Sequence, residues 1–178
     1  MISYAVGNTL EFGGYSWLIL QNYGDHVLVI SADVLEERHA YHSEFEFDDD
    51  DVEAGEIEGD VTWERCTLRK WLNEKFFSTF TQMEQEKILL ANLKNFGNPV
   101  YGTDGGNDTY DRIFMLCIDD VERYLTEEQR SVSDWWWLRS PGDGEMAAVV
   151  TSSGTILTDG LEQQEECGVR PVFFLKIT

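Results

Sequence analysis

Histidine is the residue most often used as a base or a metal ligand near neutral pH, and this chain has three of them. His39 and His42 are three residues apart, a spacing that would place two zinc ligands on one face of a helix. No cysteine or third histidine lies near them in the sequence. We therefore interpret both as surface histidines and not as a metal site.

No spaced motif identifies an enzyme. The chain lacks GxSxG, HExxH, P-loop and GxGxxG patterns. Asp and Glu together number 34, so carboxylate pairs of the kind that a hydrolase uses must occur by chance. We therefore assign no catalytic residue and expect a non-enzymatic protein, with a carboxylate-based hydrolase as an alternative.

One loop carries several candidate ligands for a cation. Segment 103–111 reads TDGGNDTYD, and its oxygen donors are Asp104, Asn107, Asp108 and Asp111. Oxygen ligands on a flexible loop suit calcium. Asp and Asn side chains also bond to the backbone of their own turns without a metal. We favour this metal-free interpretation and expect no cofactor, with calcium as the alternative.

Two arginines and three adjacent tryptophans lie in strand-like segments. Arg139 in WLRS and Arg170 in GVRP need carboxylates or carbonyls for their donors, so we predict that at least one is buried and paired, with a structural role. Along a strand Trp136 must point away from Trp135 and Trp137. We predict that Trp136 packs in the core and that Trp135 or Trp137 is exposed enough to contact a ligand.

The net charge of −21 restricts the partners. Such a surface repels nucleic acids and anionic membranes, so we expect no direct binding to either. A protein, a small polar ligand or a basic protein surface remains a suitable partner. Ten acidic residues fall within 44–60, where we predict a solvated acidic loop.

The cysteines and the N-terminal segment indicate a compartment. Cys66, Cys117 and Cys167 are far apart and form neither a disulfide framework nor a zinc ribbon, which fits a reducing environment. We find no signal peptide and no run of about 20 apolar residues. The expected location is the cytoplasm or a phage particle.

Strand-like segments flank two or three helices, which predicts an α+β fold and a single domain over residues 1–178. Alternating apolar residues in the first thirty positions predict a meander. A helix is expected from Thr67, a second from the Thr81–Glu84 capping box to about Asn92, and a short third one capped by Asp119 or Asp120. The last third predicts strands at Trp135–Ser140, Met146–Val150, Thr155–Thr158 and Val169–Ile177. With strands at both ends, we expect the termini to lie close together.

Four ordered motifs carry a family resemblance. They are TWERCTLRKWLN, NPVYGTDGGNDTYDRIFML, WWWLRSPG and GVRPVFFL. In this order they resemble a domain of unknown function found in bacteria and their phages, over nearly the whole chain. The resemblance implies no activity, because none is assigned to that family.

The late WxLRS…GVRP arrangement is similar to the C-type-lectin-like fold, in the branch of formylglycine-generating enzymes and retroelement variable proteins. This resemblance implies a twisted antiparallel sheet with flanking helices and long irregular loops. The catalytic cysteine pair of those enzymes has no match here, and neither do the EPN, QPD or WND motifs of sugar-binding lectins.

In retroelement variable proteins the surface that corresponds to Asp143–Gly168 displays the binding residues. The resemblance therefore implies ligand-binding candidates on this surface, namely Asp143, Glu145, Thr151, Asp159 and Glu162. Trp135 and Trp137 are further candidates, from the alternation along their strand. The leading hypothesis is a non-enzymatic ligand- or protein-binding domain of C-type-lectin-like type, associated with phages or mobile elements. The alternative from another class is an acidic phage inhibitor or nucleic-acid mimic that binds a basic partner.

Overall fold

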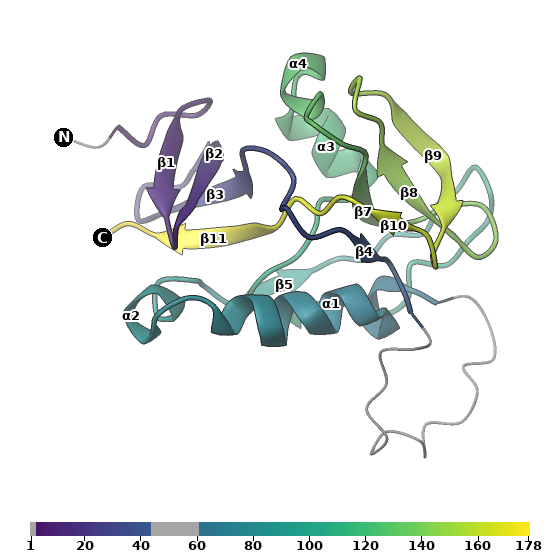
Figure 1. Cartoon of the computed structure of the whole chain (residues 1–178), viewed down its shortest axis with the longest axis horizontal. Coiled ribbons are helices and arrows are strands. Elements are labelled where there is room, and N and C mark those ends of the chain that lie inside the picture. The colour runs from purple at the N-terminus through teal and green to yellow at the C-terminus, as the bar shows by residue number, and fades with distance from the viewer. Residues whose placement is uncertain (1–2, 44–60) are drawn as a thin grey trace, which may run out of the picture.

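The first strands of the chain and the last one share a sheet. In the computed structural model, which describes residues 3–43 and 61–178, the antiparallel strands β1 (Thr9–Phe12), β2 (Tyr15–Asn22), β3 (His26–Ser31) and β11 (Val172–Lys176) pair in that order. The two chain ends lie on the same side of the molecule and line one groove (Figure 1), as expected. The predicted acidic loop at 44–60 lies outside the described residues.

A second antiparallel sheet contains β7 (Trp136–Pro141), β8 (Met146–Val150) and β9 (Ile156–Glu162). The strand predicted at Met146–Val150 is observed as β8 with the same bounds. The strand predicted to end at Thr158 is too short, because β9 continues through Asp159 and Gly160 to Glu162. Gly160 has φ +88, and a Cβ there would lie 2.0 Å from Ala147 O. The glycine thus permits a bulge, at which the β8–β9 register shifts.

Short ladders and short helices complete a mixed fold that is mostly sheet. The ladders join β4 (His39–Ala40) to β10 (Glu166–Cys167) and β5 (Ala91–Leu93) to β6 (Thr109–Asp111). The helical elements are η3 (Trp63–Arg65), α1 (Thr67–Trp71), the π-helical turn η4 (Leu72–Phe76), α2 (Gln82–Gln85), α3 (Ile118–Tyr124) and α4 (Glu127–Arg130). In Figure 1, α1 and α2 lie along one side of the molecule, with α3 and α4 on the other.

The sequence predicts the beginnings of the helices better than their ends. The Thr81–Glu84 capping box is confirmed, but α2 ends at Gln85 and not near Asn92. The chain after α2 turns into extended backbone instead, since Leu89 donates to Phe174 O of β11. The N-cap of α3 is Cys117, so the prediction of Asp119 or Asp120 as its cap is wrong; Asp120 instead accepts a hydrogen bond from the Cys117 amide. Pairing with strands therefore overrides the helical pattern of 86–92.

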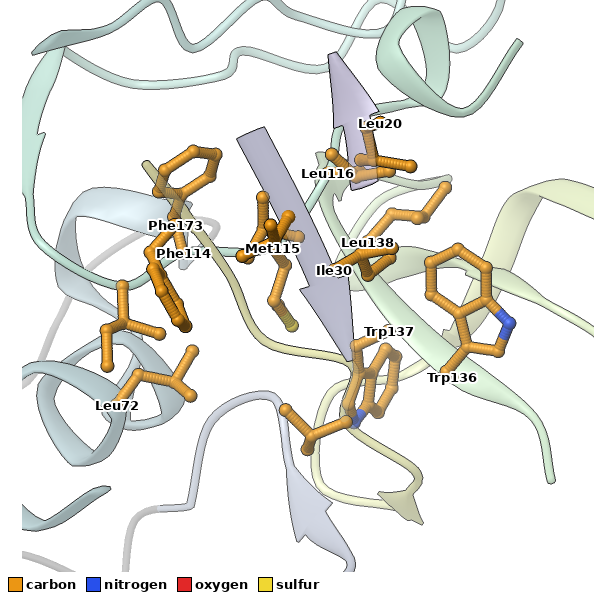
Figure 2. Packing of buried hydrophobic residues seen from close by; sticks show 14 of the residues in the cluster. Leu20, Ile30, Leu72, Phe114, Met115, Leu116, Trp136, Trp137, Leu138 and Phe173 are labelled. Atoms are coloured by element: carbon orange, nitrogen blue, oxygen red, sulfur yellow. The ribbon is translucent and has the colours of Figure 1, made fainter. Parts of the chain in front are cut away.

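The core is built around tryptophans from distant segments. Trp17, Trp63, Trp136 and Trp137 have almost no exposed surface. Figure 2 shows Trp136 and Trp137 on opposite sides of β7, as the predicted alternation requires. Both faces of this strand are therefore packed.

Burial of the Cys66 thiol predicts a weakening of the fold at alkaline pH. Burial raises the pKa of Cys66 from 9.0 to about 12. Between these values the unfolded chain releases a proton that the folded chain retains, so stability falls as pH rises. Cys66→Ser removes this titration and keeps an acceptor for the Arg69 amide at the start of α1.

We expect urea unfolding from pH 8 to 10.5 to show the wild type losing stability relative to Cys66→Ser, by up to about 1.4 kcal/mol per pH unit above pH 9. The other two buried thiols are common to both proteins, so their contributions cancel. Parallel stability curves for the two proteins would contradict the raised pKa.

Candidate functional site

The tryptophan run contributes mainly to the core. Trp136 and Trp137 are fully buried, and Trp137 Nε1 donates to His39 O at 2.8 Å. The prediction of Trp137 as a ligand contact is wrong, because both faces of β7 are covered and its side chain has no exposed surface. Trp135 precedes the strand and is half-buried, so it stays a candidate.

Arg139 and Arg170 are both buried and paired, as predicted. Arg139 Nη1 donates to Asp120 Oδ2 at 2.9 Å and to Met115 O at 2.8 Å, and Nε donates to Asn95 Oδ1 at 3.2 Å. The guanidinium therefore ties β7 to the start of α3 and to the loop that follows β5. Its role here is to position these segments.

The four candidate calcium ligands point to separate partners. Asp111 accepts from Trp63 Nε1 and Arg69 Nε, and Asp104 accepts from the Gly106 amide. Asn107 donates to Glu64, and Asp108 pairs with Lys94. Within 3–43 and 61–178, no group of three or more His, Cys, Asp or Glu could hold a metal. The structure thus does not bring these four side chains together as one site.

The two histidines before the acidic segment are buried, so the interpretation of both as surface residues is wrong. His39 and His42 expose 7% and 3% of their surface. The ring of His39 lies 4.0 Å from that of Trp71, centroid to centroid. The β4–β10 ladder covers this segment, a long-range pairing that local polarity does not predict.

The loop over residues 94–108, here called the clamped loop, is held from two sides. Asn98 Nδ2 donates to Pro141 O at 3.1 Å and to Thr158 O at 2.9 Å, and Thr103 Oγ1 donates to Gly142 O at 2.8 Å. A Cβ on Gly105 would lie 2.2 Å from Asn95 O, so only glycine fits this close approach. Side-chain hydrogen bonds therefore hold the NPVYGT motif against the WWWLRSPG motif.

The same loop meets the first motif on its other side. Asn107 bonds to Glu64, and Asp111, just after the loop, bonds to Trp63 and Arg69. A Cβ on Gly106, with φ +77, would lie 2.5 Å from Thr62 Oγ1. Three of the four motifs thus contact one another, and their polar side chains are used to fix the clamped loop.

Large apolar side chains project from this fixed backbone. Phe96, Val100 and Tyr101, here called the apolar crest, are exposed by 62%, 71% and 37%. Phe96 lies between two cavities of about 670 and 330 Å³, and it lines both together with Cys117 and Asp119. The crest is therefore a hollowed apolar surface on a rigid support.

Four of the predicted binding residues gather at the neighbouring end of the second sheet. Asp143, Glu145, Asp159 and Glu162 are all exposed. The Asp143 amide donates to Asp159 O, and Met146 pairs with Glu162. We call these four residues the acidic turns. They adjoin the clamped loop, because Gly142 and Thr158, which precede Asp143 and Asp159, are bonded to it.

The remaining candidates lie elsewhere. Thr151 belongs to the turn at the opposite end of the β8–β9 hairpin, and Trp135 precedes β7, whose first residue pairs with Val150. A strand of five residues is about 16 Å long, so these two residues and the acidic turns do not form one site.

Sequence reasoning missed the apolar crest. A signal was present, since Phe96, Val100 and Tyr101 are large apolar residues in a loop that otherwise consists mainly of Gly, Asn, Asp and Thr. Apolar side chains in such a segment either pack inward or serve a partner. The sequence does not show which, because the outcome depends on contacts with Pro141, Gly142 and Thr158.

Comparisons with known proteins give a family and no activity. A family model described as a domain of unknown function (DUF6273) matches residues 17–177. The comparisons with curated proteins and with solved structures found no match. In the described part of the chain, no helix has the length and apolar character of a membrane span.

Proposed function

The chain belongs to the DUF6273 family of domains of unknown function, and we propose that it is a non-enzymatic domain that binds a protein partner through the apolar crest. The observation that carries this proposal is the contrast within the clamped loop. Its polar side chains bond inward to three other segments, while Phe96 and Val100 remain more than half exposed. A rigid loop that displays apolar side chains loses little entropy when a partner binds.

The charge around the crest supports a partner with basic residues. Asp119 is the charged residue that lines the larger cavity beside Phe96, and the acidic turns adjoin the same loop, whereas the smaller cavity has Lys94, Arg123 and Arg139 as well as Asp119 and Asp120. An apolar anchor surrounded by Lys or Arg would complement this surface in shape and in sign. We therefore propose a basic protein segment as the occupant, in agreement with the net charge of −21.

The alternatives are less well supported. A carboxylate-based hydrolase needs one carboxyl group whose pKa is raised by burial, whereas the acidic turns are exposed. A nucleic-acid mimic would bind through charge alone and would have no use for exposed Phe96 and Val100.

We also propose a C-type-lectin-like architecture. Its support is the shared sheet of β1, β2, β3 and β11, together with a separate sheet of β7, β8 and β9 and long irregular connections. In this proposal the apolar crest and the acidic turns occupy the loop-rich surface that binds ligands in retroelement variable proteins.

The proposal predicts that a double variant of the crest loses binding. Peptides selected from a random twelve-residue library on the wild-type protein should be rich in Lys or Arg and contain an apolar anchor. We expect Phe96→Ser with Val100→Ser to weaken these peptides by at least about tenfold, the factor that 1.4 kcal/mol gives. Fluorescence polarisation of labelled peptides measures the affinities.

The matched control is Met83→Ser with Leu90→Ser, which removes two equally exposed apolar side chains away from the crest. Peptides that bind the crest variant and the wild type equally well would refute the proposal. Titrations at 50 and 500 mM NaCl separate the alternatives, because a mimic loses binding as salt screens its charges, whereas an apolar anchor retains part of it.

A further inference from the structure

A further cavity, remote in sequence from the two beside the crest, lies between the first sheet and α1. It has a volume of about 510 Å³ and is lined by residues 14–16, 31–37, 71, 76 and 79. Cavities of this size hold small molecules or single side chains. Tyr15, Trp71 and Phe76 supply an aromatic wall.

The π-helical turn builds this wall. Residues five apart on an α-helix point about 140° away from each other, since each residue turns the helix by about 100°. In the π-helical turn Leu72–Phe76 the bonding pattern spans five residues, and the Trp71 and Phe76 rings stack with centroids 5.5 Å apart. Tyr15 packs on Phe76 at 5.6 Å. Such turns occur often at functional sites.

Acidic residues form the opposite rim. Asp33, Glu36 and Glu37 line the cavity and are exposed. Asp33 accepts from Ser133, a neighbour that holds its pKa below the ordinary value, against the effect of burial. The cavity therefore combines aromatic faces with carboxylates, the two groups that attract an organic cation.

One buried polar side chain at the cavity lacks a hydrogen-bond partner among the described residues. Ser31 lines the cavity, exposes 3% of its surface and has an unpaired hydroxyl oxygen. His39 packs against the Trp71 ring but is not among the residues that line the cavity. A buried polar atom without a partner is costly, so the Ser31 hydroxyl favours a ligand that carries N–H groups.

We propose that this cavity binds a protonated primary amine. Its aromatic wall would contact the alkyl chain and face the charge, its carboxylates would neutralise the ammonium, and the Ser31 hydroxyl would accept an N–H bond. A quaternary ammonium would satisfy the aromatic wall but none of the acceptors. The proposal concerns a site separate from the apolar crest, so each can fail without the other.

Two native cations lie near the cavity, and both already have hydrogen-bond partners. Arg170 donates to Ser31 O and Ala32 O from within the core. Arg38 pairs with Asp134 at 2.8 Å. Three carboxylates therefore face the cavity against one core guanidinium that is bonded to backbone carbonyls.

Calorimetric titration with cadaverine and with Nα-acetyl-lysine methylamide tests this site and separates a free amine from a lysine side chain. Glu37→Gln should weaken the ligand that binds by about fivefold, the factor that 1 kcal/mol gives. The matched control is Glu122→Gln, the same charge change at an exposed position of α3 that does not line the cavity, and it should leave the affinity unchanged.

Neutral 1-pentanol and pentyltrimethylammonium should bind more weakly than the primary amines. Three results would overturn the proposal: no binding of either amine at 10 mM, equal weakening by Glu37→Gln and Glu122→Gln, or equal affinity for pentanol and amine. Both variants change exposed side chains, so a folding defect does not obscure the comparison.

Discussion

Arg170→Ala is expected to lower the free energy of unfolding by roughly 3–5 kcal/mol, the range for removing one member of a buried polar network. Arg170 is 1% exposed and joins its own segment to two others. It donates to Ser31 O at 3.1 and 3.0 Å, to Ala32 O at 3.3 Å and to Gln129 O at 2.9 Å. Its guanidinium also lies over the Trp136 ring, 4.8 Å from the centroid.

The alanine variant loses stability for two reasons. It leaves these carbonyls buried without donors, and it opens a space beside Trp136. Burial lowers the pKa of Arg170 to about 10, so the side chain is charged near neutral pH and its contacts are charge-assisted. For a chain of this length the melting temperature should fall on the order of 10 °C.

Thermal unfolding followed by circular dichroism measures the effect. Arg170→Lys should fall between wild type and alanine, because an ammonium cannot reproduce the planar fork. Arg123→Ala, which removes an exposed arginine over Tyr124, is the control. A wild-type melt for Arg170→Ala would show that the buried network contributes little.

Asp111→Ala should destabilise the fold by a similar amount, roughly 3–5 kcal/mol. Its side chain is 1% exposed and accepts from Arg69 Nε at 2.6 Å, Trp63 Nε1 at 3.0 Å and Thr109 Oγ1 at 2.7 Å. Removing the carboxylate leaves a partly buried guanidinium and a buried indole N–H without their acceptor. Chemical denaturation in urea gives the free energy directly.

The control for this variant is in the same loop. Asp108→Ala removes the carboxylate that pairs with Lys94, but both side chains are largely exposed, so stability should hardly change. Equal effects of the two substitutions would contradict the assignment of Asp111 as the residue that anchors the clamped loop to α1. Dialysis against EDTA should leave both melts unchanged if the loop is held by these bonds alone.

Local patterns predicted the parts of the fold that depend on local interactions. The Thr81–Glu84 capping box, the bounds of β8 and the alternation at Trp136 and Trp137 all follow from neighbouring residues. The helix predicted to extend to Asn92 ends at Gln85, because the backbone that follows forms hydrogen bonds with β11 and β6. The strand predicted to end at Thr158 continues to Glu162, because Gly160 allows a bulge inside β9.

The candidate site shows the same division. That arginines at 139 and 170 are buried and paired follows from five donors in apolar strands. The loop that each arginine holds in place does not follow from the local sequence, since Arg139 bonds to Asn95, 44 positions away. The stacking of Trp71 on Phe76 requires a π-helical turn, which a 3.6-residue period cannot anticipate.

We propose that the apolar crest on the clamped loop receives a basic protein segment. Amide hydrogen exchange of the wild-type protein, with and without a peptide selected on it, shows where such a segment binds. We expect further slowing at 96–103, 117–119 and 140–145, and no change at β1 or α2. Protection at the groove between the chain ends, with the crest unchanged, would contradict it.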